Sequence, residues 1–133
     1  MNIVVIGGAG FIGCNVADHY LRNGHRVTVF DNFSRKGTLQ NLQWLQKKHG
    51  DKLNVVQGDT RLDFNKLKAT VGKADIVFHL AAQVAVTTSV VDPREDFEIN
   101  ALGTFNVLEA IRTSGNNPTV LYSSTNKVYG GME

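Results

Sequence analysis

Short apolar runs alternate along the chain with segments whose apolar residues recur at three- and four-residue steps. The apolar runs, such as Val27-Thr28-Val29-Phe30 and Ile76-Val77-Phe78, have the continuous character of strands covered on both faces. Strands are predicted near residues 2–6, 26–30, 53–57, 75–79 and 118–122, and helices near residues 11–22, 38–49, 62–71 and 93–114. This alternation predicts a parallel sheet whose strands are joined by crossover helices.

The segment 93–114 has the strongest helical periodicity. Pro93 suits its first turn and Asp92 suits its N-cap. Its apolar stripe consists of Phe97, Ala101, Phe105, Leu108 and Ile111. Right-handed crossovers between the strands give an α/β, Rossmann-type doubly wound sheet of strand order 3-2-1-4-5, formed as one domain from residues 1–133. The binding crevice is expected at the carboxyl ends of strands 1 and 4.

The first apolar run ends in a glycine loop that leads directly into a helical pattern. This order of strand, glycines and helix is typical of dinucleotide-binding sites. The glycines allow a tight turn, close approach of the backbone to a pyrophosphate, and close packing of helix on strand, with the phosphates at the helix N-terminus. Gly8, Gly10 and Gly13 fit the pattern G-x-G-x-x-G. Gly7, Gly10 and Gly13 fit the alternative pattern G-x-x-G-x-x-G, so the loop does not decide between subfamilies of dinucleotide-binding proteins.

Asp31 ends the second predicted strand, where a carboxylate can accept hydrogen bonds from the adenosine ribose. Such a carboxylate would repel a 2′-phosphate, so NAD is favoured over NADP. Arg35 and Lys36 reduce that preference, because an arginine in this loop can accommodate the phosphate. Asp31-Asn32 can also be interpreted as a turn, since both residue types stabilise turns, but the glycine loop favours the cofactor role.

Two more segments follow predicted strands at the same edge. Asp59, in Gly58-Asp59-Thr60-Arg61, could accept the adenine amino group or cap the next helix, and its spacing favours the cap. The segment His79-Leu80-Ala81-Ala82-Gln83 has small residues that would let the backbone pass close to a nicotinamide ribose. His79 itself is expected to be packed and hydrogen-bonded rather than to act as a base.

Hydroxyl side chains gather after strands 4 and 5, in Val86-Thr87-Thr88-Ser89 and Ser123-Ser124-Thr125-Asn126. A hydroxyl that faces the crevice could hydrogen-bond a substrate alcohol as it becomes a ketone. Loop polarity and helix capping explain the same residues, so spacing alone leaves both interpretations open.

Composition narrows the class of protein and its partners. The chain has 133 residues, of which 42% are hydrophobic and 20% charged, which is typical of one globular domain. A net charge of +2 without a basic stripe argues against nucleic acid or a membrane as partner. Cys14, the only cysteine, lies in the first predicted helix and is expected to be a small packing residue rather than a nucleophile. The lone thiol and the lack of a leader favour a cytoplasmic protein, and the spacing of the histidines predicts no metal site.

Together these residues resemble the extended short-chain dehydrogenase/reductase family, the NAD-dependent nucleotide-sugar epimerases and dehydratases. The resemblance covers the whole chain, and Ile6 departs from it mildly, because many members have threonine before the first glycine. The segments that carry it are 7–13, 31–32, 79–83 and 122–130. Within the family, the segments 31–37, 83–89 and 123–130 resemble the CDP-paratose 2-epimerases, and 96–100 fits as well.

The resemblance implies that NAD stays bound while C2 of a CDP-linked dideoxyhexose is oxidised and hydride returns to the opposite face. It implies a nucleotide-sugar substrate and a homo-oligomeric intact enzyme. Thr125 matches the family's catalytic hydroxyl, which would stabilise charge on the reacting oxygen, and Asn100 would support the site. The implied cofactor contacts are Gly7, Gly10, Phe11, Ile12, Gly13, Asp31, Asn32, Ser34, Arg35, Asp59, Thr60, Leu80, Ala81, Ala82 and Gln83.

The family's general base is a tyrosine followed four residues later by a lysine that lowers its pKa. In this chain Tyr20 is followed at that distance by Gly24, Tyr122 by Asn126, and Tyr129 by Glu133. The chain is therefore expected to be the N-terminal part of an epimerase, truncated before the helix with Tyr-x-x-x-Lys and inactive by itself. Strand 5 and the apolar stripe of helix 93–114 would then be partly exposed, so the chain is expected to self-associate or to be marginally stable.

Three other interpretations stay open. The intact protein could be a UDP-glucose 4-epimerase or a dTDP-glucose dehydratase, and residues beyond 133 that shape the sugar pocket would decide. A truncated or split gene could encode a non-catalytic NAD-binding module, which the missing Tyr-x-x-x-Lys favours. An α/β domain whose glycines serve only packing is disfavoured, because several independent loops converge on one crevice.

Overall fold

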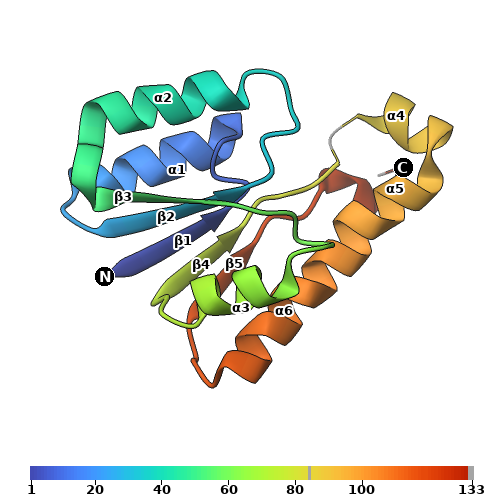
Figure 1. Ribbon diagram of the computed structural model, residues 1–133. Helices are drawn as coiled ribbons and strands as arrows, with labels where there is room; N and C mark the ends of the chain where they lie inside the picture. The colour runs from blue at the N-terminus through green and yellow to red at the C-terminus, as the bar shows by residue number, and fades with distance from the viewer. Residues whose placement is uncertain (84, 132–133) are drawn as a thin grey trace.

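The computed structural model describes residues 1–83 and 85–131, and a five-stranded parallel sheet forms its centre (Figure 1). The strands are β1 (Asn2–Ile6), β2 (Arg26–Asp31), β3 (Leu53–Gln57), β4 (Ile76–His79) and β5 (Thr119–Tyr122). Their order is β3-β2-β1-β4-β5, as the sequence predicts. The chain leaves β1 toward β2 on one side and returns to β4 on the other, so a crevice is expected at the carboxyl ends of these strands.

Helices cover both faces of the sheet. On one face α1 (Phe11–Arg22) packs beside α2 (Thr38–His49), and on the other α3 (Phe64–Val71) packs beside α6 (Gly103–Ser114) (Figure 1). Two short helices, α4 (Val86–Val91) and α5 (Pro93–Phe97), lie beyond the carboxyl ends of the strands (Figure 1). This arrangement confirms the predicted Rossmann-type α/β fold.

The central strand β1 divides the hydrophobic core into two layers. Ile3 and Val5 belong to the layer under α1 and α2, while Val4 and Ile6 belong to the layer under α3 and α6. This division follows from the two-residue period of a strand, which directs successive side chains to opposite faces. All four side chains are at most 3% exposed. A strand that is covered on both faces is apolar throughout, which explains the continuous run in the sequence.

The helix predicted over residues 93–114 is confirmed as a continuous run that contains one π-helical turn. α5 ends at Phe97, a π-helical turn covers Glu98–Leu102, and α6 begins at Gly103. After this turn α6 approaches the loop that follows β3 so closely that a Cβ on Gly103 would lie 2.6 Å from Thr60 Oγ1. Asp92 caps α5 as predicted, because its Oδ1 accepts a hydrogen bond from the Glu95 N–H at 3.0 Å.

Most of the apolar stripe that predicts this helix lies on its outer side, while Ile111 packs against the core. Phe97, Phe105 and Leu108 are 65%, 60% and 52% exposed, which confirms their expected exposure. The buried residues of α6 are instead Gly103, Val107 and Ala110, small enough to bring the helix close to its neighbours. The edge strand β5 is also exposed at Leu121 and Tyr122. None of the helices in the described ranges has the length and apolar character needed to cross a lipid bilayer.

Two local features differ from the prediction. α3 begins at Phe64 rather than near residue 62, because the N–H groups of Leu62 and Asp63 first close a turn on the Asp59 carbonyl. The segment Val86–Val91 forms α4, a helix that the pattern of apolar residues does not indicate.

We predict that the chain self-associates through the apolar side chains exposed on α5 and α6, because contact between such surfaces removes them from water. The double variant Phe105→Gln, Leu108→Gln should lower the molar mass measured by light scattering toward that of a monomer. Leu39→Gln is the matched control, since it replaces a leucine that is 57% exposed on α2, and it should leave the mass unchanged. A monomeric wild-type chain with an ordinary mesophilic unfolding midpoint would refute the prediction.

Candidate functional site

A pocket opens at the carboxyl edge of the sheet, where the loops after β1, β2, β3 and β4 meet. Most of the cofactor contacts implied by the resemblance line it. They are Gly7, Gly10, Asp31, Asn32, Ser34, Arg35, Asp59, Thr60, Leu80, Ala81, Ala82 and Gln83. Phe11, Ile12 and Gly13 lie in the first turn of α1, directly after the glycine loop. The structure thus brings four loops that are distant in sequence to one site, while their contact with a cofactor stays a prediction.

The glycine loop depends on glycine at the two ends of a tight turn. Gly7 has a φ of +81°, and a Cβ on it would lie 2.8 Å from the backbone nitrogen of Ala81, so the loops after β1 and β4 can meet. A Cβ on Gly13 would collide with the Gly7 carbonyl oxygen, so α1 packs directly on the loop. Gly8 is buried against β2, whereas Gly7 and Gly10 line the pocket. In the spacing G-x-x-G-x-x-G, the first two glycines thus line the pocket and the third packs α1 on the loop.

The start of α1 suits an anion. Gly10 is the N-cap of the helix, and no side chain in the described part of the chain caps it. The N–H groups of a first turn have no partner within the helix, and the helix dipole places positive potential there, so a phosphate is favoured. The side chains of Phe11 and Ile12 are apolar, so the backbone N–H groups are the only hydrogen-bond donors that these two residues can offer to such an anion.

Asp31 shapes the loop after β2 and also lines the pocket. Its Oδ2 accepts a hydrogen bond from the Ala9 N–H at 3.0 Å, and its Oδ1 accepts one from the Phe33 N–H at 2.9 Å. The second bond supports a left-handed backbone at Phe33, whose φ of +57° is rare outside glycine. Each carboxylate oxygen keeps a further lone pair, so Asp31 can still accept hydrogen bonds from ribose hydroxyls. The turn interpretation and the cofactor interpretation are therefore compatible.

Asp59 is paired with Arg61 beside the pocket. Arg61 donates from Nε to Oδ1 at 3.0 Å and from Nη2 to Oδ2 at 2.9 Å. The Arg61 N–H also donates to Oδ1, and Asn32 Nδ2 donates to Oδ2 at 3.2 Å. The side-chain hydrogen bonds from Arg61 lower the pKa of Asp59 from its usual 3.8 to about 2, against burial, which acts to raise it. Asp59 is consequently an anion at neutral pH.

The interpretation of Asp59 as a helix cap is wrong. α3 has Asp63 at its N-cap position, without a capping hydrogen bond from that side chain. Asp63 instead accepts a hydrogen bond from the Asp59 N–H at 2.8 Å. Because α3 begins only at Phe64, the Asp59 carboxylate bonds Arg61 instead, and it accepts both the backbone N–H and the guanidinium of that residue.

Hydrogen bonds from the segment that joins α5 and α6 fix the loop after β4. The Gln83 N–H donates to Asn100 Oδ1 at 2.9 Å, and Asn100 Nδ2 donates to Asp96 Oδ1 at 3.0 Å. Asn100 lies in the π-helical turn and does not line the pocket itself. It contacts the pocket wall through Gln83, and its role in supporting a cofactor site stays a prediction. Val84, which the sequence places in this segment, lies outside the described residues.

His79, at the end of β4, is packed and hydrogen-bonded as predicted. It is 3% exposed, and its Nε2 lies 2.8 Å from Thr104 Oγ1. Because Thr104 Oγ1 donates its own hydrogen to the Asn100 carbonyl, His79 is the donor in this bond and carries its proton on Nε2. Burial lowers the pKa of His79 to about 4, so the ring is neutral at physiological pH. Its Nδ1 has no hydrogen-bond partner among the residues that the structure describes.

The hydroxyl-rich segments differ in what their side chains do. Thr88 Oγ1 and Ser89 Oγ lie within hydrogen-bond distance of the Ala85 carbonyl, inside a helix that has no side-chain cap among the described residues, so the capping interpretation is wrong for these two residues. It is confirmed for Thr125, the N-cap of the short 3-10 helix Asn126–Tyr129. Thr125 Oγ1 accepts a hydrogen bond from the Lys127 N–H at 3.2 Å and is exposed. It follows the carboxyl end of β5, where the Ser123 N–H bonds the His79 carbonyl. Thr125 thus lies at the edge of the sheet that carries the pocket, without lining it.

Some pocket residues were not singled out by the sequence. They are Ile6, Phe30, Thr38, Gly58, Arg61 and Ile99. Arg61 could have been found from its position two residues after Asp59, where a guanidinium can pair with the carboxylate. Ile99 could not, because its place depends on the π-helical turn. Cys14 is buried, as predicted, and within the described ranges no cluster of side chains suits a metal ion.

Comparison with known proteins identifies the family. The sequence model of the family GDP-mannose 4,6 dehydratase matches residues 4–133, so the chain belongs to this family, within the extended short-chain dehydrogenases/reductases. It is 47% identical to a CDP-paratose 2-epimerase of Salmonella typhi over 100% of the chain and 39% of the relative. It is 39% identical to a UDP-glucose 4-epimerase of Mycolicibacterium smegmatis over 98% of the chain and 41% of the relative.

A solved structure supports the same assignment. The UDP-glucose 4-epimerase of Stenotrophomonas maltophila, crystallised with NAD and formylated UDP-arabinopyranose, superposes with a TM-score of 0.89 at 29% identity, over 100% of this chain and 39% of that one. The family is thus one of nucleotide-sugar epimerases and dehydratases. The chain spans about two fifths of the length of these relatives.

We predict that Arg61→Leu raises the pKa of Asp59 from about 2 toward its usual 3.8, because the variant removes the guanidinium that stabilises the carboxylate. A lowered pKa means that the wild-type pair stabilises the fold above pH 3.8, and that this contribution is lost as the pH falls toward 2. NMR titration of the Asp59 carboxyl carbon measures the change. Arg112→Leu, which breaks an exposed ion pair with Glu109, is the control and should leave this titration unchanged. A wild-type midpoint near 3.8 would contradict the prediction.

Proposed function

We propose that this chain is the NAD-binding portion of a nucleotide-sugar epimerase. The observation that carries the proposal is the convergence of the glycine loop, Asp31 and Asp59 on one pocket at the carboxyl edge of a parallel sheet. Their chemistry suits a dinucleotide: N–H groups at the start of α1 for the pyrophosphate, one carboxylate for the adenosine ribose, and a second for the adenine side. The NAD in the Stenotrophomonas relative supports the choice of cofactor.

The same pocket favours NAD over NADP. Asp31 lines it with a carboxylate that would lie close to a 2′-phosphate and repel it. Arg35 lines the pocket too and would offset part of that repulsion, so the discrimination is expected to be incomplete.

For the chemistry, we propose epimerisation at C2 of a CDP-linked dideoxyhexose. Its support is the 47% identity to the CDP-paratose 2-epimerase and the resemblance of three segments to that group. NAD, when bound, supplies a hydride acceptor that can return the hydride. In this proposal Thr125 donates a hydrogen bond to the reacting oxygen, a role that its exposed hydroxyl after β5 would allow. Asn100 holds the loop after β4 through Gln83.

A non-catalytic NAD-binding module is the second candidate. Within residues 1–133 the pocket offers groups for a dinucleotide, while none of the three tyrosines is followed four residues later by lysine. Turnover of CDP-paratose distinguishes the two candidates. Because the chain is expected to be inactive by itself, turnover is measured with a second chain that supplies Tyr-x-x-x-Lys. Epimerisation in that mixture supports the first candidate, and NAD binding without epimerisation fits the module. Turnover of UDP-glucose instead would favour another member of the family.

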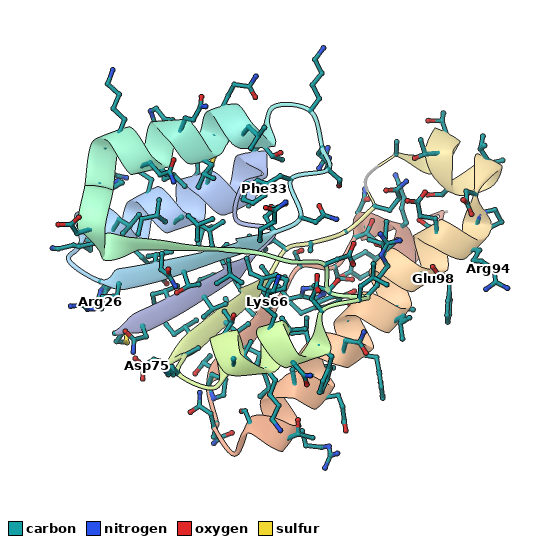
Figure 2. The ribbon with its side chains drawn as sticks, viewed as in Figure 1. Arg26, Phe33, Lys66, Asp75, Arg94 and Glu98 are labelled. Carbon is teal, nitrogen blue, oxygen red and sulfur yellow. The ribbon has the colours of Figure 1, made fainter. Side chains whose placement is uncertain are left out.

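We predict that the wild-type chain binds NAD saturably and more tightly than NADP in isothermal titration. Asp31→Ala should weaken NAD binding by roughly tenfold or more, because it removes a charged acceptor for ribose hydroxyls. The matched control is Asp75→Ala, whose carboxylate also accepts a backbone N–H, from Asn2 at 2.7 Å, but at the opposite edge of the sheet (Figure 2). NAD binding should be unchanged in this control. A folded wild-type chain that does not bind NAD would refute the proposal.

A further inference from the structure

Ala9 lies in the middle of the glycine loop, and side chains from two other elements bond its backbone N–H and its carbonyl. Ala9 is fully buried, and its N–H donates to Asp31 Oδ2 at 3.0 Å. Its carbonyl accepts a hydrogen bond from Asn41 Nδ2 at 2.8 Å, across 32 residues of sequence. Asn41 lies in the first turn of α2 and does not line the pocket. The loop is therefore clamped between the end of β2 and the start of α2.

The other hydrogen bonds of the loop are local. The Gly10 N–H bonds the Gly7 carbonyl at 3.2 Å, and the Cys14 N–H bonds the Gly10 carbonyl at 2.9 Å. These bonds close the turn and start the helix, but they do not fix the direction of the Ala9 carbonyl. Asn41 does, and it directs that carbonyl toward α2. A carbonyl oxygen turned into the site at the start of α1 would bring partial negative charge to a place that suits a phosphate.

The position of α2 is itself fixed at its other end. Asp18 on α1 accepts a hydrogen bond from Lys48 Nζ at 2.9 Å and lies 2.6 Å from His49 Nε2, and both partners are on α2. At its start, Thr38 Oγ1 donates to the Arg35 carbonyl at 2.7 Å. The two helices that flank the glycine loop are thus tied together, and this places the Asn41 amide against Ala9.

We propose that Asn41 is a positioning residue for the pyrophosphate part of the dinucleotide site, acting through the Ala9 carbonyl rather than by touching the ligand. This inference rests on the proposed NAD-binding function. The inference assigns different roles to Asp31 and Asn41, the two side chains that bond Ala9. Asp31 faces the adenosine ribose and holds the loop, whereas Asn41 only holds the loop. The loss of Asn41 should accordingly weaken ligands that carry the pyrophosphate and spare adenosine.

The test compares NAD with adenosine on the full chain by NMR titration. Asn41→Leu keeps nearly the volume of the side chain and removes the donor, and Asn41→Ala removes the donor without adding apolar surface. Both variants should bind NAD roughly tenfold more weakly, as expected for a buried carbonyl that loses its partner, and bind adenosine within about twofold of wild type. Asn116→Leu is the matched control, because Asn116 Nδ2 also bonds backbone carbonyls, of Val71 and Ala74, between α3 and β4. It should bind both ligands as wild type does.

Each outcome decides the inference. A folded Asn41 variant that binds NAD as tightly as wild type overturns the inference. An equal loss of affinity for NAD and for adenosine also overturns it, because Asn41 would then act on the whole fold. If the wild-type chain does not bind NAD, the proposed NAD-binding function itself is refuted. The wild-type side-chain amide signal of Asn41 gives a check that needs no variant: it should shift when NAD binds and stay in place with adenosine. A chemical shift that does not change when NAD binds would overturn the inference even if both variants failed to fold.

Discussion

The site depends on backbone packing that only glycine permits at the end of β1. Gly7 adopts a left-handed backbone against the Ala81 backbone, and Gly13 packs on the Gly7 carbonyl. These two contacts bring α1, the glycine loop and the loop after β4 to within van der Waals distance of one another. A side chain at either position would separate them, and the pocket they share would lose its shape. The geometry that suits a dinucleotide is in this sense a consequence of close packing.

Charge is then arranged around this backbone core. Asp31 and Asp59 lie at the ends of neighbouring strands, and each has its geometry fixed by hydrogen bonds before any ligand arrives. Asp59 is ionised because of Arg61, while His79 stays neutral because burial disfavours its charged form. Of these two polar groups at the same edge of the sheet, one is charged and the other neutral at neutral pH, and each state is set by the immediate surroundings of the group.

Local patterns predicted the fold and most of the pocket. The strand and helix periodicities are short-range signals, and the position of Asp31 follows from the glycine loop and the end of β2. The features that the sequence did not reveal depend on contacts distant along the chain. The π-helical turn and the bond from Asn41 to Ala9 are of this kind. The role of Asp59 was misjudged because a helix cap and an ion pair with Arg61 use the same carboxylate.

The central claim is that four separate loops form one NAD site, and NMR mapping tests it directly. We would titrate the isotopically labelled chain with NAD and record the backbone amide shifts. The account predicts changes in 7–13, 31–35, 59–61 and 80–83, with the amino-terminal edge of the sheet, around Asn2 and Asp75, unaffected (Figure 2). Shifts confined to one loop, shifts centred elsewhere, or none in a folded sample would contradict it.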